Sequence, residues 1–116
     1  MQIEITTDHH IKTGDHLVQE VSTDIETLLA RFSDRITRVE LHLGDDNGAK
    51  SGPADKKCAV EVRPAKQKPV GVTHHASTLE EAWKGALHKV VHLLDHRFGK
   101  LDHRKGAPTI RRPDSR

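Results

Sequence analysis

The segment from residue 77 to residue 103 constrains the fold of this chain more than any other. Its apolar residues recur at helical spacing and predict several turns of amphipathic helix; they are Leu79, Trp83, Ala86, Leu87, Val90, Leu94 and Leu101. The opposite side of this helix carries cationic or protonatable groups, namely Lys84, His88, Lys89, His92, His96, Lys100 and His103. One face is therefore expected to close a core, while the other is available to a partner. A capping box supports the start of the helix, because Ser77 and Thr78 each precede a glutamate by three residues.

Alternating and helical patterns predict the other elements. Residues 2–6, 38–43, 57–63 and 70–75 alternate as half-buried strands, and residues 16–31 match an amphipathic helix with an acidic or neutral exposed side. Asp15 or Thr13 is the expected cap of that helix. Residues 44–56 form a long polar loop, and residues 64–69 form a turn that carries two lysines. The order β-α-β-β-β-α predicts an α+β fold, a two-layer sandwich with a four-stranded mixed sheet and both helices on one face.

Composition limits the class of protein. A chain of 116 residues with 34% hydrophobic residues and only three aromatic ones predicts a single domain with a small, aliphatic core. The single Cys58 excludes an intramolecular disulfide and a multi-cysteine metal site, and its place in a strand pattern predicts a buried structural thiol. No apolar run reaches spanning length and no signal peptide is recognised, so a soluble, cytoplasmic protein without a membrane partner is expected.

Charge is distributed unevenly along the chain. Residues 1–62 contain 7 basic and 12 acidic side chains, a net charge of −5, whereas residues 63–116 contain 12 basic and 5 acidic ones, a net charge of +7. This asymmetry predicts a directed contact between the second half and a polyanion. For RNA, the scarcity of aromatic residues predicts recognition of shape and backbone rather than of stacked bases. A helix face that is only solubilising remains the alternative.

Other chemistries are less well supported. His88, His92 and His96 stand four residues apart and could hold zinc with Asp95, but no HExxH motif or cysteine partner accompanies them. Residues 45–48 approach a calcium-loop pattern, but a lysine stands where the closing glutamate is needed. The outward sheet face could offer acid–base groups, but an open face without a pocket is expected to be solvated charge; these groups are Glu4, Glu40, His42, Glu61, Arg63 and His75. We therefore expect no enzyme, no cofactor, no metal and no small-molecule substrate.

Several segments together resemble the ribosome hibernation family, of the short hibernation promoting factor and ribosome-associated inhibitor type (ribosomal subunit interface proteins). They are MQIEIT (1–6), RFSDRITRVELHL (31–43), DKKCAVEVRP (55–64), PVGVTHHASTLEEAWKGALHKVVHLL (69–94) and GKLDH (99–103). The resemblance implies a fold similar to double-stranded-RNA-binding domains over residues 1–105, followed by a basic, disordered tail at 106–116. It also implies a partner, the small ribosomal subunit and its ribosomal RNA. There the protein would block messenger and the A- and P-site transfer RNAs without catalysis.

The same resemblance directs attention to particular cations. The basic second-helix positions of the family correspond here to Lys89, His92, His96, Arg97 and Lys100. With the residue pattern, the full set of expected RNA contacts is Lys84, His88, Lys89, His92, His96, Arg97 and Lys100, with Arg35, Arg38 and Arg63 as weaker candidates.

Two departures from the family qualify this expectation. The first helix carries Glu20, Asp24 and Glu26 where family members often have lysine or arginine. Several second-helix positions are histidine, whose charge changes near neutral pH, so binding is expected to strengthen toward pH 6. The long members' second domain is not expected here, and whether single ribosomes or ribosome pairs result is left open. The alternative function is a protein–protein regulator, for example of a transcription factor, that uses the acidic first helix.

Overall fold

The computed structural model describes residues 1–8, 14–45 and 56–106. Within these ranges, Asp15 and residues 100–106 are described by their backbone alone. The elements along the chain are β1 (Gln2–Thr7), α1 (Asp15–Leu28), the 3-10 helix η1 (Ala30–Arg35), β2 (Ile36–Asp45), β3 (Lys56–Pro64), β4 (Val70–Ala76) and α2 (Leu79–Gly106). Apart from η1, this is the predicted order.

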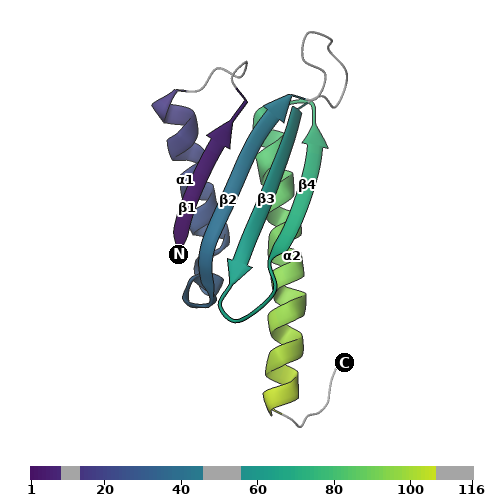
Figure 1. Cartoon of the computed structure of the whole chain (residues 1–116). Helices are drawn as coiled ribbons and strands as arrows, with labels where there is room; N and C mark the ends of the chain where they lie inside the picture. Colours follow the sequence, from purple (N-terminus) through teal and green to yellow (C-terminus); the bar gives the residue numbers. More distant parts are fainter. Residues whose placement is uncertain (9–13, 46–55, 107–116) are drawn as a thin grey trace.

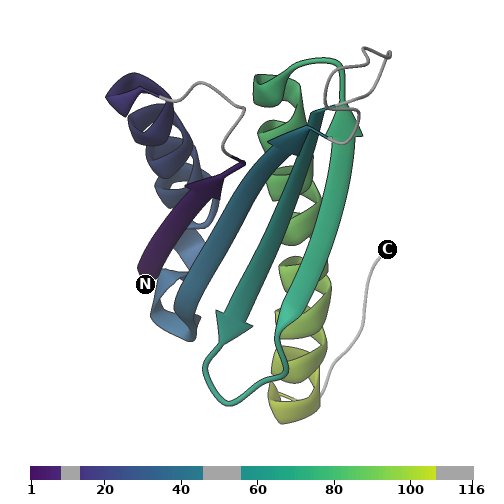
Figure 2. The same ribbon diagram turned by 45° about the horizontal axis from the view of Figure 1, so that its top comes forward.

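The sheet has the order β1-β2-β3-β4, with β1 parallel to β2 and the remaining pairs antiparallel. Both helices lie on the same face of the sheet, and α2 runs past the end of the sheet near the β3–β4 turn (Figures 1 and 2). The predicted two-layer α+β sandwich and its parallel first crossover are therefore confirmed.

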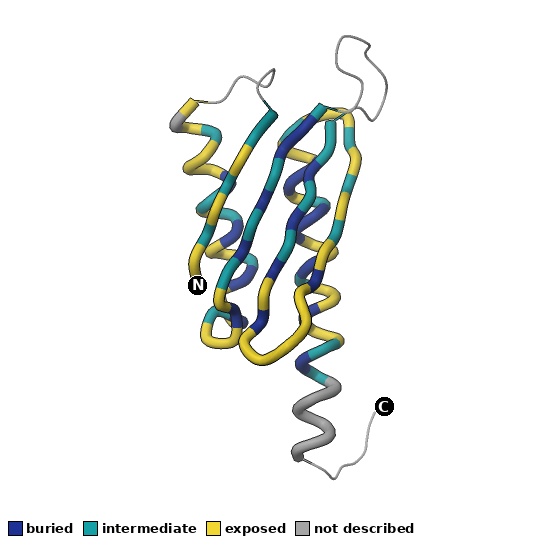
Figure 3. Tube along the Cα trace, viewed as in Figure 1, coloured by how far each residue is buried: buried dark blue, intermediate teal, exposed yellow. Residues whose placement is uncertain are grey.

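Alternation along the strands decides which face is covered. The inward side chains of β2, for example Val39, Leu41 and Leu43, are buried, and those between them are partly or fully exposed. The buried stripe of α2 lies against this layer (Figure 3); it consists of Ala82, Trp83, Ala86, Leu87, Val90, Leu94 and Phe98. The core is thus largely aliphatic, as the composition predicted.

The ends of the helices differ in part from the prediction. Gly14 is the N-cap of α1, and no side chain of the described residues is seen to cap it. Of the two expected caps, Asp15 is wrong, because it is the first helical residue; Thr13 lies outside the described residues. The α-helix was expected to reach residue 31 but ends at Leu28, and the chain then tightens into η1. The Phe32 ring of η1 lies 5.6 Å from the Phe98 ring.

The capping box of α2 is confirmed. The backbone N–H of Glu81 donates to Thr78 Oγ1 over 3.1 Å, and Ser77 Oγ donates to Glu81 Oε1 over 2.9 Å. α2 continues beyond Gly99 to Gly106, the first residue of the expected tail. A glycine inside a helix costs only about 1 kcal/mol, which packing of the neighbouring Phe98 can offset. Residues 107–116, the rest of that tail, lie outside the described residues.

Close contact between α2 and β4 depends on one glycine. A Cβ atom on Gly85 would lie 2.2 Å from Cδ2 and 2.3 Å from Nε2 of His74. Because real Cβ atoms do not approach so closely, the missing side chain at position 85 allows His74 of β4 to pack directly against the α2 backbone.

Cys58 is fully buried in β3, and this burial raises the pKa of its thiol to about 12. The prediction of a buried structural thiol is confirmed. Because the thiolate is the reactive species, we expect Cys58 to resist a thiol reagent at pH 8 in the native protein and to react fully in denaturant. A colorimetric thiol assay with and without guanidinium chloride measures this difference, and rapid labelling of the native protein would contradict it.

None of the helices in the described residues is both long and apolar enough to cross a membrane.

Candidate nucleic-acid interface

The exposed face of α2 is formed as the sequence predicted. The side chains of His88, Lys89, His92 and His96 are exposed and that of Arg97 is half-buried. Lys100 belongs to α2, but its side chain lies outside the described part. One uninterrupted helix thus carries most of the expected RNA contacts.

Two cations lie on the side of α2 that borders β4. Lys89 Nζ donates to the backbone carbonyl of Thr73 over 3.1 Å, and Arg97 Nη1 donates to the carbonyl of Lys68. They are eight residues apart, so about 12 Å separates them along the helix axis. We call Lys89, Leu93 and Arg97 the β4 flank of α2. Because these two acceptors are neutral carbonyls, they do not cancel the positive charge of the two side chains.

A shallow apolar hollow lies along the β4 flank. It has a volume of about 440 Å³ and is lined by Val72, His88, Lys89, His92 and Leu93. Leu93 is 40% exposed, one of the few large hydrophobic side chains with that much exposure in the described residues. The flank therefore presents an apolar surface beside the positive charge of Lys89. This combination suits a nucleic-acid strand whose phosphates contact Lys89 while its sugars and base edges lie on the apolar surface.

The α1 side of α2 has a different electrostatic character. Lys84 forms an ion pair with Glu80 over 2.8 Å and lies in a groove whose α1 wall includes Glu20 and Asp24. The hydrogen bond and the charge of Glu80 are the main causes of a raised pKa of Lys84, and the charges of Asp24 and Glu20 add to it. Lys84 stays protonated, but its charge is locally compensated.

The acidic residues of α1 have a partly structural explanation that the sequence did not reveal. The indole N–H of Trp83, which is 2% exposed, donates to Asp24 Oδ2 over 2.8 Å. An acceptor at position 24 thus satisfies a buried donor of α2. Nearby, Arg31 forms an ion pair with Asp95 over 2.6 Å, which compensates a carboxylate on α2.

Arg38 and Arg63 lie on the sheet face that the helices leave uncovered. Glu4, Glu40 and Glu61 stand in one row across this face. Arg38 Nε lies 2.6 Å from Glu40 and its Nη2 contacts Glu4, while Arg63 lies 3.5 Å from Glu61. The hydrogen bond with Glu40 is the main cause of a raised pKa of Arg38. The structure therefore does not bring these two candidates together with those on α2.

Arg35, the third weaker candidate, lies at the end of η1. Its guanidinium carbon is 4.9 Å from the centroid of the Phe98 ring, a cation–π geometry. Arg35 therefore contacts α2 directly, through Phe98.

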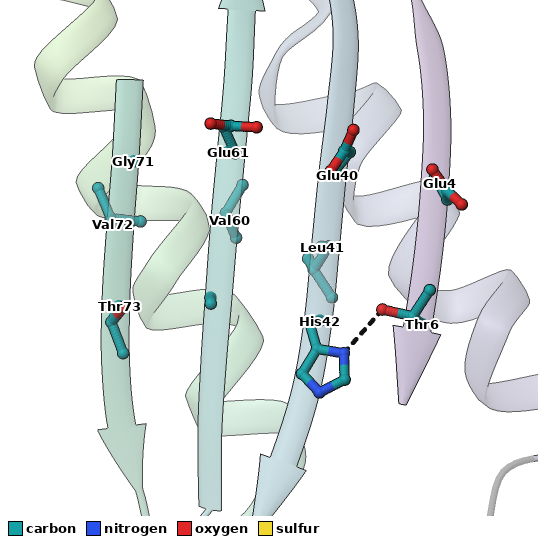
Figure 4. A pocket seen from close by; sticks show the side chains of 11 residues that line it. Glu4, Thr6, Glu40, Leu41, His42, Val60, Glu61, Gly71, Val72 and Thr73 are labelled. Atoms are coloured by element: carbon teal, nitrogen blue, oxygen red, sulfur yellow. Dashed lines mark hydrogen bonds between the residues drawn. The ribbon is translucent and has the colours of Figure 1, made fainter. Parts of the chain in front are cut away.

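The uncovered sheet face is also hollowed, which corrects the expectation of a face without a pocket. The hollow is shallow, with a volume of about 460 Å³, and Glu4, Glu40 and Glu61 form one row of its lining, with Thr6, His42 and Thr73 further along the strands (Figure 4). At its rim His42 Nδ1 lies 2.7 Å from Thr6 Oγ1, and His42 Nε2 lies 2.8 Å from Asp8 Oδ1. Because Asp8 also accepts a bond from the backbone of residue 45, this network ties the end of β1 to β2.

Metal binding finds no geometric support in the described residues, which contain no group of three or more histidine, cysteine, aspartate or glutamate side chains able to hold an ion. This includes the zinc site considered at His88, His92, His96 and Asp95. Residues 46–48 of the calcium-like pattern lie outside the described part.

The sequence interpretation missed two cations at the end of the flank. Lys66 and Lys68 lie in the turn between β3 and β4, and together with Gln67 and Arg97 they line a hollow of about 570 Å³. The signal was present as a turn with two lysines, but nothing in the sequence places this turn beside residue 97 of α2.

Comparison with known proteins identifies the family. The family model described as "Sigma 54 modulation protein / S30EA ribosomal protein" matches residues 3–102. The chain belongs to this family. The family is ribosome-associated and non-enzymatic, in agreement with the sequence-based resemblance and with the expectation of no enzyme.

Solved structures agree in fold. The N-terminal domain of Protein Y from Thermus thermophilus superposes with a TM-score of 0.67 at 15% identity, over 84% of this chain and 99% of that chain. A ribosomal subunit interface protein from Coxiella burnetii gives a TM-score of 0.65 at 15% identity, over 85% of this chain and 99% of that chain. No curated protein matched in the sequence comparison.

Proposed function

We propose that this member of the S30EA ribosomal protein family is a cytoplasmic hibernation factor that binds the small ribosomal subunit through its ribosomal RNA. In this proposal it occupies the decoding channel and excludes messenger and the A- and P-site transfer RNAs. Family membership supports a ribosomal partner, as does the similarity in fold to the ribosomal subunit interface protein from Coxiella burnetii. No bond is made or broken, so inhibition follows from occupancy alone.

One observation carries the assignment of RNA to the β4 flank. Arg38 and Arg63 on the uncovered sheet face, and Lys84 on the α1 side of α2, are paired with carboxylates. Lys89 and Arg97, in contrast, donate to backbone carbonyls. A polyanion gains most where positive charge is not already compensated, because no existing ion pair must be broken.

The position of the aromatic residues supports recognition of the RNA backbone. Trp83 is 2% exposed and Phe32 and Phe98 are each 5% exposed, so the chain's three aromatic rings are all in the core. Stacking of RNA bases needs an exposed ring. Binding is therefore expected to depend on salt much more than on base sequence.

Co-sedimentation with separated ribosomal subunits tests this proposal. We expect the protein to comigrate with the small subunit at low salt and to dissociate as salt is raised. Protein that stays at the top of the gradient at every salt concentration would reject the proposal. That result would favour the alternative, a protein–protein regulator that uses the acidic surface of α1.

Binding is expected to be stronger at pH 6 than at pH 8. His88, His92 and His96 are exposed on α2 beside Lys89 and Arg97, and the nearby Asp95 is already paired with Arg31. Histidine is in general the side chain whose charge changes between pH 5 and pH 8, and positive charge on this face favours RNA binding. Co-sedimentation at both pH values should show a several-fold difference in affinity.

The triple variant His88→Gln/His92→Gln/His96→Gln is the matched control for this effect. It keeps hydrogen-bonding side chains at the three positions but cannot change charge, so its affinity should be nearly the same at pH 6 and pH 8. Equal affinity of the unmodified protein at the two pH values would contradict the histidine contribution.

A further inference from the structure

The turn between β3 and β4 has a backbone conformation that lysine rarely adopts. Lys66 has a φ of 61°, and it is the one non-glycine residue with positive φ in the described part of the chain. Glycine or asparagine would occupy this left-handed region with less strain. A charged side chain at such a position suggests a role for the side chain itself, since the turn alone does not require it.

This turn is held in place from two sides. The backbone N–H of Ala65 donates to the carbonyl of Arg35 over 2.7 Å, which fixes the turn to η1. Arg97 of α2 donates to the carbonyl of Lys68, which fixes it to the β4 flank. The two lysines therefore extend from a backbone that is anchored by neighbouring elements.

The side chains around the turn form a hollow whose charged groups are all positive. Its lining consists of Lys66, Gln67, Lys68 and Arg97, with no carboxylate among them. Neither Lys66 nor Lys68 forms an ion pair within the described residues, whereas Lys56 at the other end of β3 is paired with Asp45 over 3.2 Å. Arg97 has five N–H donors, so several remain after its bond to Lys68.

From this geometry we infer that Lys66, Lys68 and Arg97 form a second phosphate-binding site, for an RNA phosphate next to the strand that contacts Lys89. Arginine offers a planar pair of donors to phosphate oxygens, and the two lysines add point charges at the mouth of the hollow. The inference rests on the proposed function, because it extends the RNA path from α2 to the β3–β4 turn.

The double variant Lys66→Asn/Lys68→Gln tests the inference. Asparagine tolerates the left-handed conformation of residue 66, so the fold should be retained, and thermal unfolding verifies this. In co-sedimentation with small subunits at increasing salt, we expect about a tenfold loss of affinity. The slope of log affinity against log salt should become shallower by one to two units, about 0.7–0.9 for each phosphate that the variant no longer neutralises.

The matched control is Lys56→Gln/Lys57→Gln, which removes the same charge at the opposite end of β3. It should change affinity and slope far less than the turn variant. Equal losses for the two variants, or no loss for the turn variant, would overturn the second site. Failure of the unmodified protein to bind small subunits would instead overturn the proposed function, so the two failures are distinguishable.

Discussion

Replacing Lys89 and Arg97 by glutamine is expected to weaken binding to the small ribosomal subunit by about a hundredfold. Each charge-assisted hydrogen bond to a phosphate contributes about 1.5 kcal/mol or more, and the removal of two such bonds accounts for this factor. Both side chains lie on the β4 flank and bond to backbone carbonyls. The salt dependence of binding should weaken in parallel, and titration of labelled protein with small subunits measures both quantities.

The variant Arg38→Gln/Arg63→Gln is the matched control for this prediction. It removes the same number of positive charges, but from the uncovered sheet face, where Arg38 contacts Glu4 and Glu40 and Arg63 contacts Glu61. We expect its affinity to stay within a few-fold of the unmodified protein. A greater loss in the control than in the flank variant would place the interface on the sheet face and contradict the assignment.

The substitution Gly85→Ala is expected to destabilise the fold by about 1–3 kcal/mol, the usual range for overpacking a tight contact. In an exposed helix the same change would stabilise by up to about 1 kcal/mol, because alanine is the better helix former. The opposite sign is expected here because a Cβ at position 85 would lie 2.2 Å from His74 Cδ2 and 2.9 Å from His74 Cγ. Urea unfolding followed by Trp83 fluorescence measures the free energy of unfolding.

A second substitution separates this clash from other causes. In a His74→Ala background the imidazole is absent, so Gly85→Ala should then be neutral or stabilising. If Gly85→Ala destabilised equally in both backgrounds, contact with His74 would not be the cause. Together the two single variants and the double variant form a double-mutant cycle. It isolates the interaction between positions 74 and 85 in the free energy of unfolding.

Most of the fold was predictable from local patterns. Each strand alternates with period two, and the apolar stripe of α2 follows helical spacing, so buried positions such as Val39 and Leu87 could be assigned from the sequence. The ends of the helices were less predictable. The capping box at Thr78 has a recognisable side-chain pattern, whereas the N-cap of α1 is Gly14, which has no side chain to reveal it.

The candidate site was predictable only in part. Helical periodicity placed the histidines and Lys89 on the exposed face of α2, but it could not indicate which cations have carboxylate partners. The partner of Lys84 is close in sequence, whereas the contact of Arg38 with Glu4 joins residues 34 positions apart in the chain. The hollow between the β3–β4 turn and Arg97 also forms only through tertiary packing.

The acidic first helix is consistent with a separation between a carboxylate-rich α1 side of α2 and a positively charged β4 flank. Asp24 bonds to Trp83, and Glu20 and Asp24 surround Lys84. The carboxylates thus lie on the α1 side of α2, away from the β4 flank. Electrostatic attraction to RNA is therefore expected to depend on the β4 flank and the β3–β4 turn rather than on α1.

Competition with transfer RNA tests the central claim most directly. Small subunits programmed with messenger are incubated with labelled transfer RNA and increasing amounts of the protein, and both ligands are measured on the recovered subunits. The proposed function predicts that transfer RNA is released as the protein binds, with more protein required when transfer RNA is more concentrated. Full retention of transfer RNA on subunits saturated with the protein would show that the decoding channel is not its binding site.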